Sequence, residues 1–204
     1  HYLGYSASRN GKDRTPIYLP EIELREYYLP QFREAVRTGS ASVMVNSSEI
    51  NGVPVHANKY LLTDVLRKEL GFEGVIVTDW EDIKRLNDRH NVAATPREAV
   101  VMAINAGIDM SMVPGDFSFY DLLIEAVKKG EVSMSRIDDA VKRILVMKYK
   151  TGLFENPYPE PASFGNFGKP EFQQYALDAA REAMTLLKNS DQVLPLAKNK
   201  KVMV

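Results

Sequence analysis

The fold of this chain is decided by the stretch Gly71-Phe72-Glu73-Gly74-Val75-Ile76-Val77-Thr78-Asp79-Trp80. A β-branched apolar run that opens after a glycine is typical of a strand buried on both faces, as in a parallel sheet. Asp79 then lies at the carboxyl end of that strand, where α/β enzymes place their catalytic groups. A carboxylate beside an indole also suits sugar chemistry, because an indole can stack on a pyranose while the carboxylate reaches its reactive carbon.

The same pattern returns on either side of this strand. Short apolar strands are predicted over residues 42–46 and 108–112, and the three strands begin near residues 42, 74 and 107, so they are spaced 32 and 33 residues apart. Helices are predicted over residues 21–37 (divided at Pro30), 60–70, 95–107, 118–129 and 135–150. Repeats of strand, loop and helix of this length are typical of βαβ units, in which the strands are parallel and the crossovers right-handed.

The texture of the chain changes after Phe154. Residues 155–171 contain four prolines and two glycines, and this composition predicts an extended interdomain linker. A helix over 172–187, a turn and the opening of a strand at 200–204 follow. The sequence therefore predicts a first domain over 1–154, a linker over 155–171 and the start of a second α/β domain over 172–204. We interpret the chain as a piece of a longer protein and expect it to need the rest of that chain as a partner.

The composition excludes several function classes. The 204 residues are 45 % hydrophobic, and 26 Lys and Arg balance 27 Asp and Glu, so no global field recruits nucleic acid or anionic lipid. There is no cysteine for a disulfide, a thiolate metal site or a nucleophile, and the three histidines lie too far apart for a metal-binding motif. No apolar run approaches the ~20 residues of a membrane span. We expect a small neutral substrate, with no cofactor, metal, nucleic acid or membrane as partner.

The polar residues near the strand ends have competing interpretations. Asp79 could simply cap the following helix, but the polar residues at the other strand ends favour a functional role. Glu49 is more typical of a polar turn, and His56 of a loop or capping position. Asp109 lies inside a strand, where a carboxylate is tolerated only if it is hydrogen-bonded or paired, so structural pairing is expected.

Several motifs resemble glycoside hydrolase family three. Residues 71–80 resemble that family's nucleophile signature, G-F-x-G followed by an apolar strand and S/T-D-W. Residues 51–57 (N-G-V-P-V-H-A) are similar to its N-G-x-P-x-H-A loop, and residues 12–16 (K-D-R-T-P) to its R-D-R-T-P segment. Residues 185–196 resemble the L-L-K-N…L-P-L segment that opens its second domain. The motifs occur in the family's order over essentially the whole chain.

The resemblance implies an exo-acting, retaining β-glucosidase or a close relative. It implies that Asp79 is the nucleophile that forms a covalent glycosyl-enzyme intermediate, that Trp80 lines the sugar subsite, that His1 binds the non-reducing sugar and that Met44 lies near it. It also implies a fold: the second half of a (β/α)8 TIM-like barrel, followed by a linker and the first helix and strand of an α/β sandwich domain. The general acid/base would lie in that next domain. A periplasmic or secreted location is favoured by the resemblance alone.

One departure from the family pattern stands beside the nucleophile. Many members read S-Y-N after the first of these strands, whereas this chain reads Asn46-Ser47-Ser48, so a serine replaces the tyrosine. Other functions stay open at this point: an inactive carbohydrate-binding barrel, a β-xylosidase or a glycoside phosphorylase of the same family. A lyase or aldolase barrel normally needs a Schiff-base lysine or metal ligands at the strand ends, and the sequence shows neither there.

Overall fold

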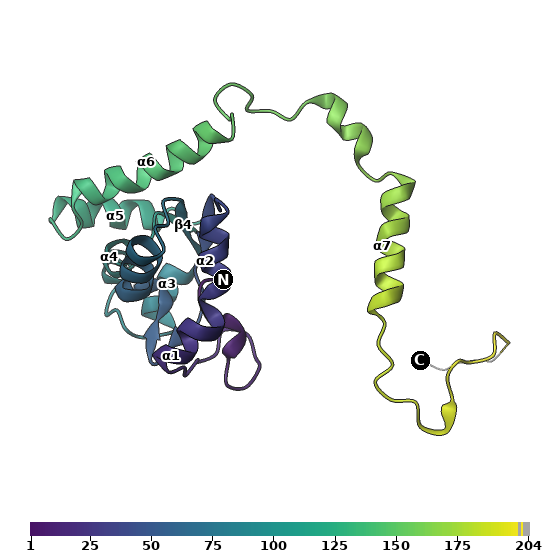
Figure 1. Ribbon diagram of the computed structural model, residues 1–204. Coiled ribbons are helices and arrows are strands. Elements are labelled where there is room, and N and C mark those ends of the chain that lie inside the picture. Colours follow the sequence, from purple (N-terminus) through teal and green to yellow (C-terminus); the bar gives the residue numbers. More distant parts are fainter. Residues whose placement is uncertain (200, 202–204) are drawn as a thin grey trace. The chain divides into compact units, whose positions relative to one another are not determined.

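The computed structural model describes residues 1–199 and 201 of the chain (Figure 1). These residues form two compact units, His1–Glu155 and Asn156–Val204. The first unit gathers the helices α1 to α6 around a small sheet (Figure 1). Within the described residues, no helix combines the length and the apolarity that a membrane span requires. The predicted strand at 200–204 falls largely on residues outside those described.

The sheet of the first unit is parallel, as predicted. Its described strands are β1 (Ser42–Met44), β4 (Val75–Trp80) and β5 (Met110–Met112), in the order β1-β4-β5. Tyr2 adds a parallel bridge to Val45 on the outer edge of β1. The strand predicted from residue 108 begins only at Met110, although the Asp109 amide already donates to the Ile76 carbonyl at 2.9 Å.

The helix predicted over 21–37 is divided at Pro30, as expected. It consists of α1 (Glu21–Glu23), a five-residue π-helical segment η2 (Leu24–Tyr28) and α2 (Pro30–Arg37). Proline has no amide hydrogen to donate, so it is tolerated in the first turn of a new helix. The helix predicted over 60–70 is η4 (Tyr60–Glu69), which has π-helical i→i+5 bonding.

The remaining elements of the first unit follow the predicted order. α4 (Pro96–Ala106) is capped by Thr95, whose hydroxyl accepts from the Glu98 amide at 3.1 Å. The other elements are η1 (Tyr5–Ala7), the hairpin β2 (Glu49–Ile50) and β3 (Val53–Pro54), η3 (Val55–Ala57), α3 (Asp82–Asp88), α5 (Ser118–Lys128) and α6 (Met134–Lys150). Because β4 leads directly into α3, and β1 into the β2–β3 hairpin, the loops at the carboxyl ends of these strands meet at one edge of the sheet.

The two faces of the sheet differ in burial. Val43 and Ile76, which lie side by side on β1 and β4, are buried in the core under the helices. Met44, Val77 and Met110 share the other face in register, and Met110 is 45 % exposed while its two neighbours are only half-buried. Asp79 follows Val77 by two residues, at a bulge where the register between β4 and β5 shifts between Val77 and Trp80.

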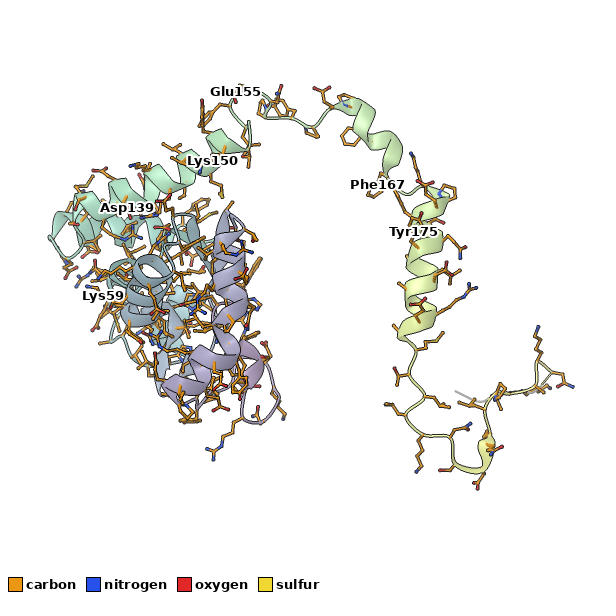
Figure 2. The ribbon with its side chains drawn as sticks, in the orientation of Figure 1. Lys59, Asp139, Lys150, Glu155, Phe167 and Tyr175 are labelled. Carbon is orange, nitrogen blue, oxygen red and sulfur yellow. The ribbon has the colours of Figure 1, made fainter. Side chains whose placement is uncertain are left out.

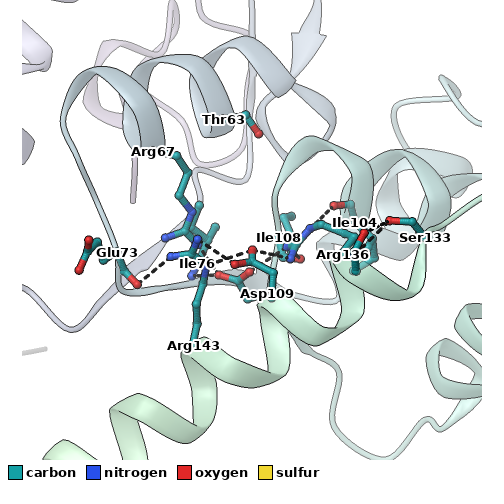
Figure 3. Close-up of polar contacts among 12 residues, drawn as sticks. Thr63, Arg67, Glu73, Ile76, Ile104, Ile108, Asp109, Ser133, Arg136 and Arg143 are labelled. Atoms are coloured by element: carbon teal, nitrogen blue, oxygen red, sulfur yellow. Dashed lines mark hydrogen bonds and ion pairs between the residues drawn. The ribbon is translucent and has the colours of Figure 1, made fainter.

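The buried carboxylate of Asp109, directly before β5, joins the sheet to the helices η4 and α6 (Figure 3). The Asp109 side chain is fully buried and accepts from Arg67 of η4, from Arg136 of α6 at 2.8 Å and from the Ile76 amide at 2.8 Å. The predicted structural pairing of Asp109 is confirmed. Arg143, two helical turns after Arg136 on α6, donates to the Glu73 carbonyl at 2.9 Å. This bond connects α6 to the loop before β4 (Figure 3).

The second unit is helical in its described part. It contains η5 (Pro161–Asn166), α7 (Pro170–Ala183) and η6 (Ser190–Gln192). The prediction of a helix over 172–187 was wrong at its carboxyl end, because Met184 is already extended. Among the described residues of α7 none is buried, and Phe167 and Tyr175 are 93 % and 68 % exposed (Figure 2). Local propensity alone specifies the end of a helix poorly.

Candidate active site

Asp79 lies next to the end of β4, and four separate parts of the chain direct donors at its carboxylate. Oδ2 accepts from the Ser47 hydroxyl at 2.6 Å and lies 3.2 Å from His1 Nε2 and 3.4 Å from Arg14 Nη2. Oδ1 accepts from the Trp80 amide at 2.6 Å. The Asp79 side chain keeps 15 % of its surface exposed. The carboxylate is therefore held firmly but still reachable.

This environment keeps Asp79 ionised. Burial raises the pKa of the carboxyl, but the hydrogen bonds from Ser47 and from the Trp80 amide and the charge of Arg14 outweigh it, so the pKa lies below its usual range. A carboxyl group with a lowered pKa is suited to act as a nucleophile or a charge stabiliser. It is not suited to donate a proton at neutral pH.

A buried histidine supports Asp79 from below. The Asp79 amide donates to His56 Nε2 at 3.3 Å, so the imidazole proton is assigned to Nδ1, which lies 3.8 Å from Asp82 Oδ2. His56 is 2 % exposed, and burial lowers its pKa to about 3. His56 was expected at a loop or capping position, but it lies on η3 beneath the backbone of Asp79 as a neutral imidazole.

A second carboxylate, Asp82 in the first turn of α3, completes the cluster. It is 2 % exposed and pairs with Arg14 Nη1 at 2.8 Å and Arg85 Nε at 3.1 Å. Burial raises the pKa of Asp82, and the charge of Asp79 adds to this effect. Arg14 bridges the two carboxylates, so it offsets the repulsion between them.

The residues singled out in the sequence are distributed around this cluster. His1 contacts the carboxylate, and its ring packs edge-on against Tyr5 with 4.6 Å between the centroids. The Trp80 amide donates to Asp79 Oδ1, and Trp80 as a whole is 49 % exposed. Met44 lies on the open sheet face beside Val77, which comes two residues before Asp79. The sugar-binding roles of His1, Met44 and Trp80 stay predictions.

The competing interpretations can now be compared with the structure. The Asp79 carboxylate does not cap α3, because the N-cap residue is Glu81, and no side-chain cap bond is found at that end of the described helix. Glu49 Oε2 lies 3.4 Å from His90 Nδ1, in a separate pair. No group of three or more His, Cys, Asp or Glu side chains in the described part of the chain is arranged to hold a metal ion.

The buried histidine makes the stability of the protein depend on pH. The pKa of His56 falls from 6.5 to about 3 on folding, so between these values the unfolded chain binds a proton that the native state refuses. Stability is therefore lost as the pH falls through this window, by about 2 kcal/mol between pH 7 and pH 5. Urea unfolding of the full-length protein at both pH values should show this loss, and His56→Gln should lack it. An equal loss in the variant would contradict the assignment.

Comparison with known proteins identifies the family. Residues 1–147 match the glycosyl hydrolase family 3 N-terminal domain. The chain belongs to glycosyl hydrolase family 3. It is 50 % identical to the lysosomal beta glucosidase of Dictyostelium discoideum over 98 % of this chain and 25 % of that protein, and 39 % identical to a beta-xylosidase of Formosa agariphila over 96 % of this chain and 28 % of that protein. The chain thus spans about a quarter of the length of the curated relatives it matches.

A solved family 3 structure shows the same α/β fold. The beta-glucosidase from Listeria innocua in complex with glucose superposes with a TM-score of 0.83 at 31 % identity, over 97 % of this chain and 27 % of that chain. The Dictyostelium relative is named lysosomal, whereas the resemblance in the sequence favoured a periplasmic or secreted protein. The compartment of this family 3 chain stays a prediction.

Three members of the cluster escaped the sequence interpretation of this family 3 chain. Arg14 belongs to the K-D-R-T-P segment, which was noticed without a role for the arginine, and His56 belongs to the N-G-V-P-V-H-A loop, where only a loop or capping position was expected. Asp82, two residues after the motif that ends at Trp80, was given no role. Their position within family motifs was the available signal, because nothing in local periodicity distinguishes a buried arginine or aspartate from an exposed one.

Proposed function

We propose that this chain is the part of a retaining, β-glucosidase-like exo-glycosidase that supplies the nucleophile, Asp79. The observation that carries the proposal is an ionised, partly exposed carboxylate at the end of a parallel strand, held by donors from four parts of the chain. The names of the relatives, β-glucosidase and β-xylosidase, support a β-glycoside at the non-reducing end as substrate.

The reaction needs two carboxyl groups about 5 Å apart. Asp79 attacks the anomeric carbon, the bond from that carbon to the leaving oxygen breaks, and the second carboxyl group protonates the leaving oxygen. Water then hydrolyses the resulting ester, with net retention of configuration. Asp82 is unsuited to be the second group, because it is buried and bound by Arg14 and Arg85. We propose that the acid/base comes from another part of the protein, as the family resemblance implies.

The surroundings of Asp79 suit a pyranose. A sugar whose anomeric carbon reaches the carboxylate also comes within reach of the His1 imidazole, which lies 3.2 Å from Oδ2. The half-exposed Trp80 is available for stacking on a C–H face of the ring, and Met44, which pairs with Val77 two residues before Asp79, adds apolar surface.

The sheet supports the half-barrel interpretation. Four parallel segments lie in the order Tyr2, β1, β4 and β5, with helices on one face and an open second face. In a (β/α)8 barrel the second face points to the interior, where the strands of the other half would cover it. We therefore propose that the rest of the protein is the partner of this face.

Trapping with a 2-fluoro glycoside tests the proposal. A 2-deoxy-2-fluoro-β-glucoside should inactivate the full-length protein, and mass spectrometry of the digested protein should find the sugar on the peptide that contains Asp79. The corresponding xyloside reagent, used in parallel, compares the two sugars that the relatives' names suggest. A label on any other peptide would refute the assignment of Asp79, and full activity with no label would refute the covalent mechanism.

A further inference from the structure

Ser47 stands where many family members carry a tyrosine, and the structure shows it in a tightly held position. It follows β1 directly and is 1 % exposed. The preceding Asn46 is completely buried and fixes this turn: its side-chain amide donates to the Leu3 carbonyl at 2.7 Å, and its side-chain oxygen accepts from the Ser48 amide at 2.7 Å. The Ser47 hydroxyl therefore has little freedom to leave its place.

The hydroxyl makes the two oxygens of Asp79 unequal. Oδ2 accepts from the Ser47 hydroxyl at 2.6 Å and from Arg14 Nη2 at 3.4 Å, and His1 Nε2 lies 3.2 Å from it. Among the described residues, Oδ1 accepts only from the Trp80 amide at 2.6 Å. Hydrogen bonds occupy lone pairs and withdraw electron density, so Oδ1 is left as the oxygen with a lone pair free to react.

We infer that Ser47 is a positioning residue that holds Oδ2 as the non-reacting oxygen of Asp79 and so presents Oδ1 to the anomeric carbon. The inference rests on the proposed role of Asp79 as the nucleophile. An Oδ1 lone pair forms the new bond to carbon while the bond to the leaving oxygen breaks and that oxygen takes a proton from the acid group. Oδ2 becomes the carbonyl oxygen of the ester and continues to accept the hydrogen bond from Ser47.

A purely structural role for Ser47 predicts no shift in the acidic limb of the pH profile when its hydroxyl is removed. The neighbouring Ser48 provides a matched control. Ser48 is equally buried at 1 % exposure, and its hydroxyl has no hydrogen-bond partner among the described residues. Removing either hydroxyl deletes one buried oxygen from the same turn. Of these two hydroxyls, the one that donates to the Asp79 carboxylate is that of Ser47.

The test measures kcat/KM against pH for the full-length protein and three variants with an aryl β-glucoside. In Ser47→Ala we expect kcat/KM to fall about 10- to 100-fold, as for loss of a hydrogen bond to a charged group, and the acidic limb of the profile to move to higher pH. Ser47→Thr, which keeps the hydroxyl, should retain the wild-type limb, and Ser48→Ala should match the wild type. An unshifted limb in Ser47→Ala would overturn the inference.

The 2-fluoro trap separates this inference from the proposed function and covers a variant that does not fold. If the wild type is not labelled on Asp79, the proposed function itself fails. If it is labelled, a crystal structure of the trapped wild-type protein decides the rest without any variant. The sugar should be attached to the Asp79 oxygen that faces the Trp80 amide, and the Ser47 hydroxyl should donate a hydrogen bond to the carbonyl oxygen of the ester. Attachment of the sugar to the oxygen that faces Ser47 would refute the positioning role of Ser47 but leave Asp79 as the nucleophile.

Discussion

Replacing Asp79 with alanine is expected to lower the turnover of the full-length protein by a factor on the order of 10⁴, because the variant has no oxygen to form the glycosyl ester. The fold should survive, since the side chain lies at the edge of the sheet and keeps 15 % of its surface exposed. Initial rates with an aryl β-glucoside and a circular dichroism spectrum measure the two halves of this prediction.

Two additions make the Asp79 experiment specific. Asp88→Ala removes an exposed aspartate at the end of α3, nine residues away in the same segment, and should leave turnover unchanged. Azide is small enough to enter the space left by the Asp79 carboxylate, and it would attack the anomeric carbon from the same side. In Asp79→Ala it should restore turnover and yield the α-glycosyl azide. A β-azide, or a variant with near wild-type turnover, would show that Asp79 is not the nucleophile.

The second large effect is on stability. Asp109→Ala is expected to cost about 3–5 kcal/mol, because it leaves the mostly covered guanidinium groups of Arg67 and Arg136, whose side chains are only 12 % and 17 % exposed, without their fully buried carboxylate. Burial already lowers the pKa of Arg67 to about 10, which shows how strongly this site disfavours an unpaired cation. The Ile76 amide would also lose its acceptor. Urea unfolding of the full-length protein measures the loss.

The control for Asp109 is a surface ion pair. Glu34 and Arg37 on α2 lie 2.7 Å apart with side chains 59 % and 70 % exposed, and Glu34→Ala should cost less than about 1 kcal/mol. The Asp109→Ala molecules that remain folded should keep the wild-type dependence of kcat/KM on pH. The reason is that Asp109 contacts β4 at the Ile76 amide, three residues before Asp79, and not at Asp79 itself. A loss for Asp109 as small as the loss for Glu34 would show that the cluster in Figure 3 is not a stabilising centre.

The sequence anticipated elements whose signal is local. The run from Val75 to Thr78, the helix that begins beside Thr95 and the break at Pro30 each depend on neighbours within a few residues, and each is found where it was expected. The helix predicted over 172–187 ends at Ala183, and Met184 is already extended, so its carboxyl end could not be read from local periodicity. Local propensity is weak, and tertiary packing supplies most of the stability of a helix.

The sequence by itself determined that parallel strands repeat along this chain and that Asp79 stands where one of them ends, since both statements follow from periodicity along the chain. It also established the family through motifs in a characteristic order. Only the tertiary structure decided that Ser47 bonds to one oxygen of Asp79, that Arg14 bridges Asp79 and Asp82, and that His56 lies buried beneath them. The partners of a buried polar side chain are set by which segments meet in space, and periodicity carries no record of those meetings.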